Sequence, residues 1–149
     1  MQKLLLPLAS SMLIMIISGC ASNPDLPPGG TPMPPTTGLE PQPGDDKLKR
    51  DKVFLDFESS SLVVEGTTQR NARVVLNGNL SDPCHMLRVV VSPLNSQREI
   101  SLDVYSVFDP GVRCIMVLRP FNAAIPLGSF SGGHFTVFAN GQLLGEFDS

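Results

Sequence analysis

Short runs in which apolar and polar residues alternate dominate the chain from residue 53 onward. The run "VFLDF" places Val53, Leu55 and Phe57 on one face of an extended segment, and "REISLDVYSVF" alternates over residues 98–108. Successive side chains of a β-strand point to opposite faces, so this period of two indicates strands with one buried face. The runs "LRVVV" and "IMVL" are shorter, contain β-branched residues and indicate buried strands.

The C-terminal stretch "FTVFANGQLLGEF" predicts a hairpin. Two alternating runs flank Asn140-Gly141, a dipeptide typical of two-residue hairpin turns. No segment of ten or more residues shows a helical period. Seven or eight short strands within residues 53–149 predict an all-β fold, a small antiparallel sandwich.

The N-terminal segment has the pattern of an export signal. A cationic start at Lys3 precedes an apolar run of about 14 residues, Leu4 to Ile17. A spanning helix needs roughly 20 apolar residues, so this run matches the apolar region of a signal peptide. It ends in Ile17-Ser18-Gly19-Cys20, which closely resembles the lipobox of bacterial lipoproteins.

The lipobox resemblance implies that residues 1–19 are removed and that Cys20 becomes a lipidated N terminus. In that family the cysteine thiol takes a diacylglycerol, and two or three acyl chains hold a protein stably at a bilayer. The protein is then extracytoplasmic and anchored to a bacterial membrane. Ala21-Ser22 lacks the aspartate associated with inner-membrane retention. This implies the outer membrane in a diderm and the cell surface in a monoderm.

Residues 20–52 are expected to form a tether. Eight of the 14 prolines fall between Pro24 and Pro43, with glycines among them and few large apolar residues. Such a composition buries too little apolar surface to fold and favours an extended spacer. Three segments result: a signal peptide (1–19), a lipidated cysteine with its disordered tether (20–52) and a β-sandwich domain (53–149).

Assigning Cys20 to lipid leaves an even number of cysteines. Cys84 and Cys114 then remain in an oxidising compartment, where disulfides persist. We favour a disulfide between them over two buried thiols.

The stretch "IPLGSFSGGHFTVFANGQLLGEF" resembles the last two strands of immunoglobulin-like domains. The resemblance implies an immunoglobulin-like sandwich. The chain has no tryptophan, and Phe135 stands where a tyrosine would supply the hydroxyl of a tyrosine corner.

Few residues suggest chemistry. His85 and Met86 are weak candidates for a copper site, because imidazole and thioether ligands suit copper. A hydrolase would need Ser129 or Ser131 beside His134 and a carboxylate. We predict no catalytic site, no cofactor and no metal, and therefore not an enzyme. A copper-binding protein and a small hydrolase are the alternatives.

A binding function is the expectation that remains. Residues 119–133 form the longest predicted connection, and its apolar residues Phe121, Ile125, Leu127 and Phe130 are candidates for contact with a partner, although they could instead close the end of the sandwich. A net charge of −3 gives no reason to propose a nucleic-acid partner. We expect an adhesive, accessory or inhibitor-like module that binds a protein of the cell envelope.

Overall fold

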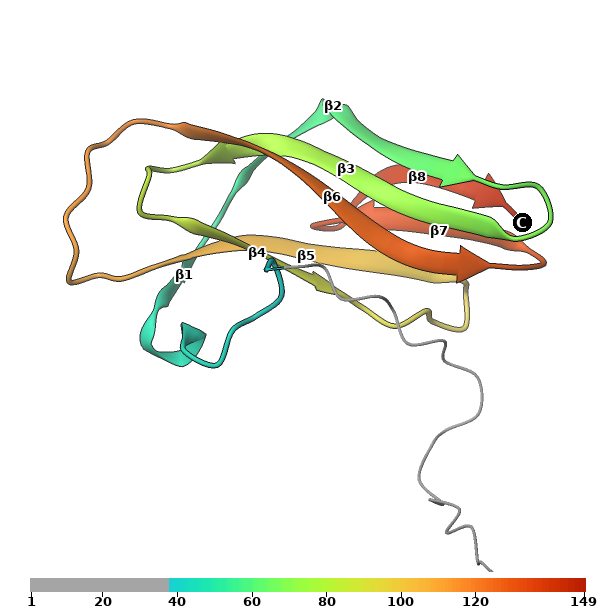
Figure 1. Ribbon diagram of the computed structural model, residues 1–149, viewed down its shortest axis with the longest axis horizontal. Helices are drawn as coiled ribbons and strands as arrows, with labels where there is room; N and C mark the ends of the chain where they lie inside the picture. Colours follow the sequence, from blue (N-terminus) through green and yellow to red (C-terminus); the bar gives the residue numbers. More distant parts are fainter. Residues whose placement is uncertain (1–37) are drawn as a thin grey trace, which may run out of the picture.

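The computed structural model describes residues 38–149 (Figure 1). These residues form eight strands and one short 3-10 helix: η1 Asp45–Lys47, β1 Lys49–Asp51, β2 Phe54–Glu65, β3 Arg70–Leu80, β4 Met86–Val91, β5 Glu99–Phe108, β6 Arg119–Phe130, β7 His134–Ala139 and β8 Gln142–Asp148. A sheet of β1, β4, β5, β7 and β8 packs on a sheet in the order β2-β3-β6. The predicted all-β sandwich of seven or eight strands is confirmed.

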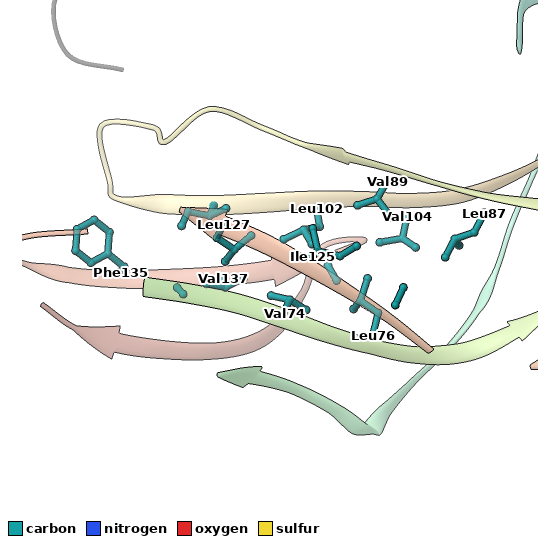
Figure 2. Packing of buried hydrophobic residues seen from close by; sticks show 14 of the residues in the cluster. Val74, Leu76, Leu87, Val89, Leu102, Val104, Ile125, Leu127, Phe135 and Val137 are labelled. Carbon is teal, nitrogen blue, oxygen red and sulfur yellow. The ribbon is translucent and has the colours of Figure 1, made fainter. Parts of the chain in front are cut away.

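The core lies between the two sheets. Every second residue of β3 is buried from Ala72 to Leu76, and the same period buries Ile100, Leu102 and Val104 in β5. Figure 2 shows the labelled side chains of β3 pointing toward those of β4 and β5 in the opposite sheet. Burial of apolar side chains drives folding, so the period of two seen in the sequence selects the faces that meet.

One strand pair departs from the expected antiparallel arrangement. β5 and β7 run parallel, with Glu99 opposite Thr136 and Leu102 opposite Ala139. The two sheets of an immunoglobulin domain are antiparallel, so this pair also differs from the immunoglobulin pattern. The final hairpin is as predicted, because β7 and β8 pair antiparallel around Asn140-Gly141.

Asn140 fills a gap at the edge of β5. β7 pairs with one end of that edge and β1 with the other, which leaves Val104 between them. The side-chain oxygen of Asn140 accepts the Val104 N–H at 2.7 Å, and its amide donates to the Val104 carbonyl at 2.9 Å. A turn side chain therefore continues the hydrogen-bond ladder that no strand provides at this point.

Replacing Asn140 by glycine is expected to lower the free energy of unfolding by about 1–3 kcal/mol. Glycine keeps the left-handed backbone conformation, φ 48°, but leaves both backbone groups of Val104 without partners. Urea unfolding measures the effect. The matched control is Gln142→Gly, which changes only an exposed strand residue beside the same turn. Gly141→Asn is not a suitable control, because Gly141 has a φ of 81°. An unchanged midpoint for Asn140→Gly would show that water replaces the side chain.

Residues 38–52 belong to the folded unit, so the predicted boundary at residue 53 is wrong. The Leu39 carbonyl accepts the Val89 N–H at 2.8 Å, and β1 pairs with β5. Arg88 is buried and donates to both carboxylate oxygens of Asp45, at 2.7 and 2.9 Å. The composition of this segment gave no sign of these contacts, because Pro41, Pro43 and the mixed charges of "DDKLKRDK" are typical of a linker. The signal peptide and the rest of the tether lie outside the described residues.

The Asp45–Arg88 pair predicts a loss of stability in acid. The Arg88 guanidinium, helped by the Gln42 backbone N–H, holds the pKa of Asp45 below its ordinary value. A carboxyl that is more acidic in the folded protein stabilises it fully above the unfolded-state pKa of roughly 4 and loses that effect as pH falls through the folded-state pKa.

The measurement is the urea midpoint of Asp45→Asn and of wild type as a function of pH. The two midpoints should differ most near neutral pH and converge below about pH 4. Asp46→Asn, beside it, is the matched control, since Arg88 bonds to Asp45. A difference between Asp45→Asn and wild type that is independent of pH would contradict the assignment.

Candidate functional site

Two connections meet at one end of the sandwich. Residues 81–85 join β3 to β4, residues 109–118 join β5 to β6, and a disulfide between Cys84 and Cys114 links them. The two Cα atoms are 6.1 Å apart, a normal spacing for this bond. The predicted disulfide is confirmed. Figure 1 shows the second connection, in light orange, extending beyond the strands at the end opposite the C terminus.

A buried histidine joins this end to the N-terminal segment. His85 is 5% exposed and its ring stacks on Phe108, with centroids 4.6 Å apart. Its Nδ1 lies 2.8 Å from Asp82 and its Nε2 3.3 Å from Asp51, but neither carboxylate oxygen is aligned for a hydrogen bond along a ring N–H. The His85 ring is the main cause that holds the pKa of Asp82 below its ordinary value, and the Cys84 backbone N–H, 2.8 Å from Asp82, adds to it.

The apolar loop, residues 112–118, is the most unusual surface of the described chain. Its large apolar residues are 54–85% exposed: Val112, Ile115, Met116, Val117 and Leu118. Single exposed apolar residues are common on soluble proteins, but a continuous group is characteristic of interaction sites. The disulfide at Cys114 fixes the loop to the sandwich. The loop is therefore linked to the sandwich and exposed to solvent.

The run "IMVL" was expected to be a buried strand, and this prediction is wrong. Its residues are exposed and irregular, with only a local hydrogen bond of 3.0 Å from the Val117 N–H to the Ile115 carbonyl. A β-branched run forms a strand only where a neighbouring strand can pair with it, and none reaches this loop in the described residues. The arginines on both sides, Arg113 and Arg119, and the lack of a two-residue period were the signals that could have identified it.

His134 lies in an acidic cluster on the surface. Its Nδ1 is 2.9 Å from Asp148 and its Nε2 is 3.5 Å from Glu146. The hydrogen bond to Asp148 is the main cause that raises the pKa of His134, and both carboxylates add a Coulombic contribution. Ser129 donates instead to Asn71, at 2.5 Å, and no serine hydroxyl within residues 38–149 bonds to His134. The Ser-His-acid arrangement of a hydrolase is not assembled here.

A protein-family model, the ORF11 beta-sandwich domain, matches residues 74–149, which is just over half of the chain. The chain belongs to this family. No curated protein and no solved structure matches it. The matched part of the ORF11 beta-sandwich domain includes both connections of the disulfide-linked end. β1 and β2 precede it, yet β2 completes the three-stranded sheet.

A metal site is not formed at the disulfide-linked end of the ORF11 beta-sandwich domain. Among residues 38–149, one group of potential ligands has atoms within 4.8 Å of one another: Asp82, Cys84 and Cys114. The two cysteines form a disulfide, which has no thiolate to offer a metal. Of these three residues Asp82 alone then keeps a ligand atom, so the group does not make a metal site.

His85, the candidate copper ligand, lies far from the second histidine of the chain, His134. His134 begins β7, which pairs with the Glu99 end of β5, whereas His85 stacks on Phe108 at the other end. Ten strand residues at ~3.3 Å each separate these ends by about 30 Å. Met86 is 42% exposed beside His85. One metal ion cannot contact both histidines.

The residues expected to contact a partner from a loop at residues 119–133 lie in a strand instead. Residues 119–130 form β6, which pairs with β3 along its length, and Ile125 and Leu127 are buried in the core. Phe121 and Phe130 pack against that core. The prediction of a loop is wrong. Pro120 and Pro126 are typical of loops, but an edge strand such as β6 tolerates proline.

Cys20, the predicted lipidation site, lies outside the described residues of this ORF11 beta-sandwich protein. No helix within residues 38–149 has the length and apolar character needed to cross a membrane.

Proposed function

We propose that this ORF11 beta-sandwich protein is a lipid-anchored binding module of the bacterial cell envelope. Cys20 carries the lipid, and the sandwich lies outside the cytoplasm, at the outer membrane of a diderm or the surface of a monoderm. The lipobox-like sequence supports the anchor. The Cys84–Cys114 disulfide supports the compartment, because disulfides persist in oxidising environments and are rare in the cytosol.

The apolar loop carries the proposal that the protein binds another envelope component. Five exposed apolar side chains stand on a loop that a disulfide fixes to a rigid sandwich. Loops on rigid scaffolds commonly carry binding functions, and a surface that is already ordered loses less conformational entropy on binding. The proposed activity is binding and includes no chemical step.

Replacing Cys20 by serine is expected to abolish the anchor, because only a thiol forms the thioether to diacylglycerol. The variant should leave the membrane fraction or keep its signal peptide. Ser22→Ala, two residues away, is the matched control and should stay anchored. Fractionation and intact mass measure both results. Normal processing and membrane retention of Cys20→Ser would refute the anchor.

A photo-crosslinking residue at position 116 tests the binding surface in the anchored full-length protein. Met116 is 85% exposed in the apolar loop, and Leu143 is 51% exposed on β8. We expect crosslinks to an envelope component from position 116 and few from position 143. Equal yields from the two positions would exclude the apolar loop as the specific contact surface.

A further inference from the structure

We propose that the apolar loop inserts into the interface of the lipid bilayer that carries the Cys20 anchor. The sandwich then lies against the membrane through its disulfide-linked end. This inference rests on the proposed function, and it names the partner of the apolar loop as a phospholipid surface rather than a protein.

Charge favours a phospholipid partner. Arg113 and Arg119 stand at either side of the Ile115–Leu118 run, and Asp109 is the one acidic residue among residues 109–120, although the chain carries a net charge of −3. Both arginines are exposed, and Arg119 also lies 3.4 Å from the Pro83 carbonyl. Guanidinium groups match the geometry of phosphate, and long cationic side chains can hold their charge among headgroups while apolar neighbours insert.

The chemistry of the loop is less suited to a protein partner. Protein interfaces involve roughly 20–30 residues on each side and depend on buried tryptophan, tyrosine and arginine. Apart from the two flanking arginines, the apolar loop offers five aliphatic side chains and no aromatic ring. A second copy of this chain is an equally poor partner, because its loop offers the same side chains. A bilayer requires no shape complementarity and accepts any aliphatic side chain.

The backbone of the loop limits the depth of insertion. It is irregular, and unpaired N–H and C=O groups cost several kcal/mol in the hydrocarbon core. Near the headgroups, water and phosphate can satisfy these groups. Amphipathic segments insert only about 5–10 Å at this boundary, and five side chains at the tip of a loop fit that depth.

The anchor lies within reach of such a contact. The 17 residues between Cys20 and Gly38 span at most about 60 Å. The chain then meets the sandwich at Leu39, beside Val89 of β4. β5, which runs the length of the sandwich to the apolar loop, is about 30 Å long. Cys20 and the apolar loop can therefore contact the same bilayer.

The absence of tryptophan from the chain allows a direct test. Met116→Trp and Leu143→Trp are made in the full-length lipidated protein. Each variant is reconstituted into vesicles of phosphatidylethanolamine and phosphatidylglycerol that contain lipid brominated in the acyl chain. We expect blue-shifted emission and roughly threefold or more stronger quenching for position 116 than for the exposed control. Adding Arg113→Gln and Arg119→Gln to Met116→Trp should reduce that quenching.

Four results would overturn the inference. Equal, weak quenching at both positions in protein that sediments with the vesicles would exclude insertion and leave the anchor intact. A concentration-dependent blue shift at position 116 without vesicles would identify a second copy as the partner. A crosslink from position 116 to a protein would keep the binding function and exclude the bilayer as partner. Protein that does not sediment with the vesicles at all would overturn the anchor and the inference together.

Discussion

Replacing Cys84 and Cys114 together by serine is expected to lower the free energy of unfolding by about 3–4 kcal/mol. The disulfide joins residues 30 apart in the sequence, so its loss releases a long closed loop in the unfolded chain and raises the entropy of that state. The folded state also loses the covalent link that fixes the apolar loop. Urea unfolding of the unlipidated Cys20→Ser chain, with and without the two further substitutions, measures the change.

Reduction provides the control for this prediction. Adding dithiothreitol to the Cys20→Ser chain should lower its urea midpoint to about that of the triple variant and leave the triple variant unaffected. Limited proteolysis should then cut within residues 109–118, because few contacts other than the disulfide hold that connection. A midpoint that does not respond to reduction would mean that Cys84 and Cys114 are not bonded in solution.

Replacing Ile125 by alanine is expected to lower the free energy of unfolding by about 2–5 kcal/mol. Its side chain is fully buried in β6, so truncation removes apolar contacts and leaves a cavity between the sheets. Ile115→Ala is the matched control, because Ile115 is 70% exposed in the apolar loop. Its effect should stay within roughly 0.5 kcal/mol. Urea unfolding of both variants in one background measures the difference.

The variants Ile125→Ala and Ile115→Ala test the two places where the sequence-based expectation and the structure disagree most. Hydrophobic pattern alone assigns Ile115 to a buried strand and Ile125 to an exposed connection. If Ile115→Ala proves as costly as Ile125→Ala, the apolar loop must pack against the protein in solution. It would then be neither a binding surface nor a membrane contact.

Local pattern was sufficient for the elements whose neighbours are near in sequence. The β7–β8 hairpin needs only alternating residues around Asn140-Gly141, and the long alternation of β5 marks its buried face. The pairing of Cys84 with Cys114 followed from the number of cysteines once Cys20 was assigned to lipid. None of these conclusions depends on which strands lie side by side.

Contacts distant in sequence account for what the pattern missed. Residues 38–52 look like a linker, but Arg88 and Val89, some 40 residues or more away, supply the partners that bind Asp45 and Leu39. β6 contains two prolines, yet pairing with β3 makes it an edge strand.

The sequence by itself determined the sandwich class, the final hairpin, the cysteine pair and the expectation of a lipid anchor. Each depends on local periodicity, a short motif or a residue count. Only the tertiary structure decided which apolar run is core and which is surface. Burial depends on whether a second sheet covers a run: β3 and β5 place Ile125 between the sheets, whereas "IMVL" extends past the strands and stays exposed. The disulfide-linked end therefore carries an exposed apolar loop.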